Sequence, residues 1–276
     1  MDVIKDVLAA FLDLVFNGFT EVLNGAMSGL RTPWIPLEYF TTGPFSIVLV
    51  TLKATALTIL SICIMLEFVS VLTRTEMLKI ETVIMAVGKY VLSVGIIDAA
   101  PGILMMIFEL TMDLNTKISH TNSAVLFQTL YQNLKNSLNG FHWFELLASG
   151  LFIFFIPLLV ILIASLIIKT MVYGIMFEVA IYFVIAPIPC AFLPYNEGNP
   201  GFSHITIKFF KGFAAVCLQG TLMTLCLTVF DVILSSQADT FMSINVLLSA
   251  VTGTVILLTI AVTKCGSWAK SIMDAA

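Results

Sequence analysis

Charged residues are scarce in this chain. Only 13 Lys and Arg and 17 Asp and Glu occur in 276 residues, which is 11%, whereas a soluble globular domain carries about 25%. Hydrophobic residues make up 59% of the chain, and the formal net charge is −4. So few charges disfavour a soluble enzyme or a disordered chain, and the net charge offers no basic field for nucleic acid. The composition instead predicts a polytopic integral membrane protein with an all-α fold.

The residue patterns of common catalytic and metal sites are also missing. The three histidines have no metal-type neighbours, the five cysteines form no C-x-x-C pair, and phosphate-binding glycine motifs do not occur. We therefore expect no enzymatic activity, no cofactor and no metal site, and we interpret the cysteines as small apolar core residues. The acidic start, with Asp2 and Asp6, is not that of a cleavable signal peptide. A membrane enzyme with an unrecognised site is the weakest alternative.

The distribution of apolar and polar residues predicts four regions. Residues 1–44 form an N-terminal amphipathic helix and a connector, and residues 45–112 form the first two spans. Residues 113–142 form an extracytoplasmic loop with a short amphipathic helix, and residues 143–276 form a C-terminal transmembrane bundle. About five to six transmembrane helices follow, at residues 45–72, 82–112, 146–168, 171–194, 207–234 and 240–263.

Two segments depart from a plain span. Residues 3–30 have one apolar stripe between acidic and amide side chains, which predicts an interfacial or bundle-packed helix, and we favour packing on a partner protein. The sequence from Asp98 to Gly102 includes Pro101 and predicts a break or kink within the second span.

The lysines bear on the topology. If residues 171–194 enter the membrane and return, Arg74, Lys79 and five further lysines fall on the cytoplasmic side, as the positive-inside rule requires. Pro187, Pro189 and Pro194 permit such a broken segment. We favour five crossings plus this segment, with the N-terminus outside and the C-terminus cytoplasmic, and six plain crossings stay open as the competing interpretation. The five lysines are Lys169, Lys208, Lys211, Lys264 and Lys270.

Three charged residues lie within apolar segments, namely Lys89, Asp98 and Glu178. An unpaired charge at the membrane centre costs at least about 2.5–3.5 kcal/mol, so these side chains should face protein or water. One interpretation is a polar conduit or an ion site. We favour the other, which is contact between helices or subunits, for example an ion pair of Lys89 with Glu178.

One stretch resembles a known family. The run from Ala186 to Pro194 ends an apolar helix and is followed by a Gly/Pro-rich link, then by residues 208–214 (KFFKGFA) and by Gln219 in the next span. This resembles the polytopic inner-membrane subunit of type IV secretion systems, the TrbL and VirB-six-type family. The resemblance is strongest over residues 143–265.

The resemblance implies a noncatalytic channel or scaffold subunit of a conjugative type IV secretion system in the bacterial inner membrane. Such a subunit would form homo-oligomers, contact membrane lipid, other membrane subunits and the secretion ATPase, and support DNA or protein translocation. The five lysines would be partner contacts, although determination of topology explains them equally well. The alternative function is a small-solute transporter or ion channel that uses Lys89, Asp98 and Glu178.

Overall fold

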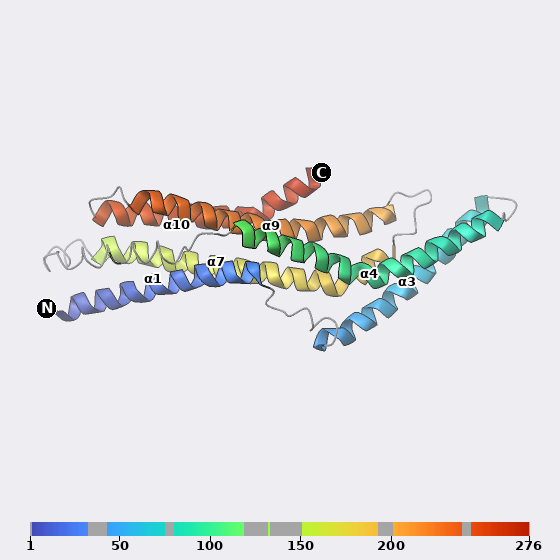
Figure 1. Cartoon of the computed structure of the whole chain (residues 1–276), viewed down its shortest axis with the longest axis horizontal. Coiled ribbons are helices and arrows are strands. Elements are labelled where there is room, and N and C mark those ends of the chain that lie inside the picture. Colours follow the sequence, from blue (N-terminus) through green and yellow to red (C-terminus); the bar gives the residue numbers. More distant parts are fainter. Residues whose placement is uncertain are drawn as a thin grey trace. The chain divides into compact units, whose positions relative to one another are not determined.

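The computed structural model describes residues 2–32, 43–74, 80–118, 151–192, 201–238 and 244–275, together with Gln132, and the regular elements of this part are helices (Figure 1). They divide into two compact units. Unit 1 comprises Met1–Thr32, Met112–Ile175 and Gln219–Ala269, and unit 2 comprises Pro33–Thr111, Met176–Leu218 and Lys270–Ala276. The helices are α1 (Asp2–Arg31), α3 (Pro44–Arg74), α4 (Ile80–Ile118), α7 (Leu151–Ile185), α8 (Pro187–Cys190), α9 (Gly201–Ala238) and α10 (Ile244–Ala275).

Five of these helices are long and apolar enough to cross a membrane, which confirms the predicted all-α membrane fold. Each contains an apolar stretch that exceeds the roughly 20 residues needed to cross the hydrocarbon core. The expected loop helix within 113–142 lies outside the described residues, except that α4 extends to Ile118. The candidate spans are Phe45–Val69, Val87–Ile118, Phe155–Ile185, Ile205–Leu234 and Ser249–Asp274.

Helix α7 joins two segments that the sequence analysis separated. It runs without interruption from Leu151 to Ile185, through Lys169, so the predicted end of a span at residue 168 is wrong. A helix of this length rises about 52 Å. It ends where Pro187 and Pro189 begin α8, because these prolines have no N–H to donate to the carbonyl groups one turn earlier.

Two further helix boundaries differ from the sequence prediction. Helix α4 is continuous from residue 98 to residue 102 and contains Pro101, so the predicted break is wrong, and the alternative of a kink stays a prediction. A long helix tolerates the loss of one backbone hydrogen bond when its neighbours are intact. Helix α10 continues through Lys264 and Lys270 to Ala275, because charged residues have good helix propensity and do not themselves end a helix.

Within unit 1, α1 packs on α7 and α9 of the same chain rather than on another protein. The ring of Phe11 stacks on Phe155 of α7, with ring centroids 6.0 Å apart, and Phe19 meets Phe230 of α9 edge to face. The Asn115 side chain donates a hydrogen bond of 3.0 Å to the carbonyl oxygen of Leu30, one of the last carbonyls of α1, which have no partner within the helix. The expected docking of this stripe on another protein is therefore wrong for its buried face, which comprises Leu12, Val15, Phe16, Phe19, Leu23, Ala26, Met27 and Leu30.

Within unit 2, aromatic rings connect three helices. Phe183 of α7 contacts both Phe108 of α4 and Phe213 of α9 edge to face, with ring centroids about 6 Å apart. Tyr182 lies against Gly212 of α9 so closely that a Cβ atom there would be 2.7 Å from the tyrosine hydroxyl. Glycine is thus what allows the two helices to approach at this point.

Candidate functional site

Helices α3 and α4 form a hairpin in unit 2 whose contact face carries charges. On α3, the buried residues Ala56, Leu60 and Cys63 follow one another at spacings of three and four residues, the spacing of a seam between packed helices. The same spacing extends to Lys53 on one side and to Glu67 on the other. Both ends of an otherwise apolar seam therefore present charges to α4, which lies beside α3 (Figure 1).

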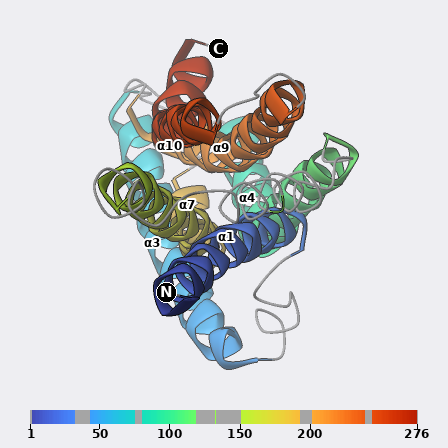
Figure 2. The same ribbon diagram turned by 90° about the vertical axis from the view of Figure 1, so that its left-hand side faces the viewer.

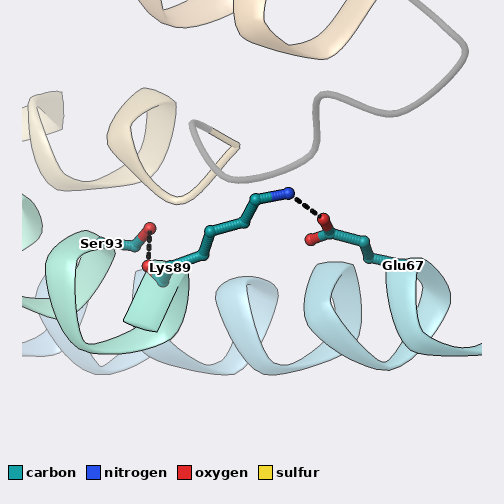
Figure 3. Close-up of polar contacts among 3 residues, drawn as sticks. All are labelled: Glu67, Lys89 and Ser93. Atoms are coloured by element: carbon teal, nitrogen blue, oxygen red, sulfur yellow. Dashed lines mark hydrogen bonds and ion pairs between the residues drawn. The ribbon is translucent and has the colours of Figure 1, made fainter. Parts of the chain in front are cut away.

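The more buried of two ion pairs, called the inner pair below, joins Glu67 to Lys89. The Lys89 ammonium group is 2.6 Å from a Glu67 carboxylate oxygen, and the Glu67 side chain is only 8% exposed. The backbone carbonyl of Lys89 also accepts a hydrogen bond of 2.7 Å from Ser93, one turn further along α4 (Figure 3). A carboxylate so thoroughly buried needs such a cation, because a lone buried charge is strongly destabilising.

The second ion pair joins Lys53 to Asp98, with 2.5 Å between the ammonium nitrogen and the carboxylate oxygen. Here the Asp98 side chain is 79% exposed on the isolated chain. Its lysine partner thus neutralises a carboxylate that faces outward from an apolar helix. In lipid, this pairing replaces two unpaired charges by one neutral contact.

The two pairs together fix how α3 and α4 align. Each helix contributes one cation and one anion, and the residue numbers increase on α3 as they decrease on α4, so the helices are antiparallel. The paired residues are about 21 Å apart along α3 and about 14 Å apart along α4, and the long lysine side chains span the difference. A shift of one turn would separate both pairs within an apolar environment, so the charges select a single register.

The third embedded charge does not join this arrangement. Glu178 is exposed on α7, and in the described part of the chain it forms no ion pair. The suggested pair of Lys89 with Glu178 is wrong, because the lysine is occupied by Glu67. The three residues singled out from the sequence are therefore not gathered at one ion site.

The proline turn is anchored within unit 2. Pro187 and Pro189 are buried in α8, and α8 contacts α3. The Pro189 carbonyl oxygen accepts a hydrogen bond of 2.6 Å from the hydroxyl of Thr206 on α9. Cys190 is buried as well, and burial raises the pKa of its thiol to about 11, which keeps the sulfur protonated and unreactive at neutral pH. Pro194 lies outside the described residues.

The five lysines proposed as cytoplasmic contacts occupy three helices. Lys169 of α7 is exposed and lies 5.9 Å from the ring centre of Tyr173, within the range of a cation–π contact. Lys211 of α9 is half-buried, whereas Lys208, Lys264 and Lys270 are exposed. None of the five takes part in an ion pair within the described residues.

Some polar residues that matter to the packing were missed by sequence reasoning. Glu67 and Lys53 were not singled out as partners for embedded charges, although their spacing of two heptads already puts them on the same face of α3. Asp231, 1% exposed within α9, was not singled out at all. Among the described residues, no group of three or more His, Cys, Asp and Glu side chains is arranged to hold a metal ion.

A sequence profile described as TrbL/VirB6 plasmid conjugal transfer like protein matches residues 48–187, just over half of the chain. The chain belongs to the TrbL/VirB6-like conjugal transfer family. Searches of curated proteins and of solved structures found no significant match. The matched range contains the whole α3–α4 seam and α7. The family was thus recognised correctly, but most of the residues that suggested it, from Ile188 to Gln219, follow the matched range.

Membership of this family, with five candidate spans, makes the protein a multi-pass membrane component of a conjugal transfer or type IV secretion apparatus. Proteins of the TrbL/VirB6-like family are structural parts of such an apparatus and associate with its other components. The paired charges of α3 and α4 suit a structural part, since they hold helices in register.

Proposed function

We propose that this TrbL/VirB6-like protein is a noncatalytic scaffold subunit that supports the passage of DNA or protein through a conjugative type IV secretion system. The family match carries the proposal. The geometry supports it, because Lys89 and Asp98 are each neutralised by a residue of α3. A conduit for ions would require charged groups that remain open to the ion, and a scaffold requires helices held rigidly together.

We place the protein in the bacterial inner membrane, with its N-terminus outside and its C-terminus in the cytoplasm. The five candidate spans in the described part of the chain support ends on opposite sides of the membrane, because an odd number of crossings separates the two ends. The link between α7 and α9, together with Lys208 and Lys211, then faces the cytoplasm, in agreement with the positive-inside rule.

The proposed partners are further copies of this chain, other membrane subunits and the secretion ATPase. Lys208 and Lys270, exposed near the ends of the spans Ile205–Leu234 and Ser249–Asp274, are candidate contacts for acidic surfaces on the cytoplasmic side. Lys169 and Lys264 lie well inside their spans, so they are not proposed as cytoplasmic contacts. Glu178 is a candidate for contact with a basic residue of a neighbouring membrane subunit, since an exposed carboxylate within an apolar helix is costly without a partner.

The decisive experiment deletes the gene and restores it in the donor cell. We expect deletion to abolish DNA transfer and the wild-type gene to restore it, while the uptake of small solutes is unchanged. Expression of the Glu67→Lys/Lys89→Glu variant, which reverses the inner pair, should also restore transfer, because a scaffold needs the pair rather than its polarity. Normal DNA transfer in the deleted strain would contradict the proposal. Selective flux through the purified protein in liposomes that is lost in Glu178→Gln would favour a transporter or ion channel instead.

A further inference from the structure

Two cysteines of unit 1 face each other across neighbouring helices. The Sγ atom of Cys226 on α9 is 3.7 Å from the Sγ atom of Cys265 on α10, and both views of the molecule show these helices side by side (Figures 1 and 2). In the sequence the two residues are 39 positions apart, so they do not form a C-x-x-C motif and the sequence alone does not identify them as a pair. The fold brings them together.

We propose that Cys226 and Cys265 form a redox-active dithiol, which small uncharged disulfides oxidise to a disulfide bond that fastens α9 to α10. A disulfide bond requires sulfurs about 2.05 Å apart, so the two atoms must approach by about 1.7 Å. Rotation about the Cα–Cβ bonds moves a sulfur by distances of this order. This proposal does not depend on the scaffold function.

The surroundings of the two thiols give the reaction an order. Cys226 is half-buried, whereas Cys265 is fully buried, so a reagent reaches Cys226 first. The Cys265 thiol donates a hydrogen bond to the carbonyl oxygen of Ala261, with 3.2 Å between sulfur and oxygen, which holds its sulfur in place beside Cys226. Cys226 is therefore the attacking thiol, and Cys265 is the resolving thiol.

The chemical steps balance with one molecule of reagent disulfide, RSSR. Cys226 gives up its proton, and its sulfur attacks one sulfur of RSSR, which forms a mixed disulfide and releases RS⁻. Cys265 then gives up its proton and attacks the Cys226 sulfur, which forms the Cys226–Cys265 bond and releases the second RS⁻. Each RS⁻ takes up one proton. The two protein thiols are thus oxidised by two electrons, and RSSR is reduced to two RSH.

The test uses the purified full-length chain in detergent and 4,4′-dithiodipyridine, an uncharged aromatic disulfide whose released thiopyridone absorbs light. The reference is the variant Cys226→Ser/Cys265→Ser, which subtracts the reaction of the remaining cysteines. We expect wild type to release two thiopyridones above this reference. Cys265→Ser should release one, half the wild-type value, and keep a pyridyl adduct on Cys226. The extra release should be lost in Cys226→Ser, because Cys265 is then shielded.

Mass spectrometry of peptides from the wild-type chain decides the proposal without any substitution. A peptide pair joined through Cys226 and Cys265 is the expected product, and treatment with dithiothreitol should separate it. Cys217, which is buried on the same helix, is the internal control and should stay unmodified. A lasting adduct on Cys226 of wild type, no reaction at either residue, or undiminished labelling of Cys265 in Cys226→Ser would each overturn the proposal.

Discussion

At the scale of single residues, the charged side chains of α3 and α4 show that the fold decides which of them form ion pairs with one another. Lys89 and Asp98 stand out in the sequence because they interrupt apolar segments. Their partners, Glu67 and Lys53, lie nearer the ends of the predicted span 45–72 and do not stand out in the same way. Which charges meet is decided by the rotation and register of two helices, and neither quantity is encoded within one helix.

The inner pair predicts a specific loss of stability. In Glu67→Gln, Lys89 keeps its charge but loses its carboxylate, so we expect the free energy of unfolding to fall by about 1–3 kcal/mol. The double variant Glu67→Gln/Lys89→Gln should recover part of this loss, because it leaves no unpaired charge. Thermal unfolding in detergent measures both effects.

The matched control is the ion pair between Asp113 and Lys117, whose side chains are exposed and lie one turn apart on α4. Removing the charge in Asp113→Asn should change the stability by only about 0.3–0.5 kcal/mol. If Glu67→Gln and Asp113→Asn lowered the free energy of unfolding equally, burial would not make the inner pair more stabilising than the exposed pair.

At the scale of elements, α1 illustrates what hydrophobic periodicity predicts. The apolar stripe correctly predicted an amphipathic helix over residues 3–30, because its period is a local property of the sequence. The surface that covers the stripe is not local. The buried face lies on α7 and α9 of the same unit, so α1 is an integral part of this bundle.

Phe19 tests this role of α1. Its side chain is 1% exposed, so Phe19→Ala should lower the free energy of unfolding by about 3–5 kcal/mol. Leu14 on the same helix is 67% exposed, and Leu14→Ala should change it by less than about 0.5 kcal/mol. Circular dichroism during heating measures both. Equal changes for Phe19→Ala and Leu14→Ala would indicate that this face of α1 is not packed against α7 and α9 in the folded protein.

A side-chain hydrogen bond from Thr206 of α9 anchors helix α8. Thr206→Val keeps the shape of the side chain but leaves the Pro189 carbonyl oxygen without its shortest donor, so we expect a loss of about 1–3 kcal/mol in the free energy of unfolding. In the control Thr58→Val, the lost hydrogen bond is an exposed one to Ala54 of the same helix, and the change should stay below about 0.5 kcal/mol. Urea-induced unfolding followed by tryptophan fluorescence compares the two, and a Thr206→Val chain as stable as its control would contradict the anchoring role.

At the scale of the whole molecule, the continuity of α7 bears on topology. A single helix over residues 151–185 accounts for one crossing, so three of the candidate spans precede the link around Asn196. With the proposed N-terminus outside, this link lies in the cytoplasm. A reporter active only in the cytoplasm, fused after Asn196, should therefore be active. The control fusion after Ala238, at the end of α9, should be inactive. An inactive fusion at Asn196 together with an active fusion at Ala238 would contradict the proposed orientation.

The sequence by itself determined the fold class, the approximate positions of the spans and the family, because apolar length, helical periodicity and composition are local properties of a chain. It also identified Lys89 and Asp98 as residues that needed partners. Only the tertiary structure decided that α7 is one helix, that α1 is covered by its own chain, and which residues pair: Glu67 with Lys89, Lys53 with Asp98, and Cys226 with Cys265. These depend on contacts between segments far apart in the sequence, where packing sets the rotation and register of each helix.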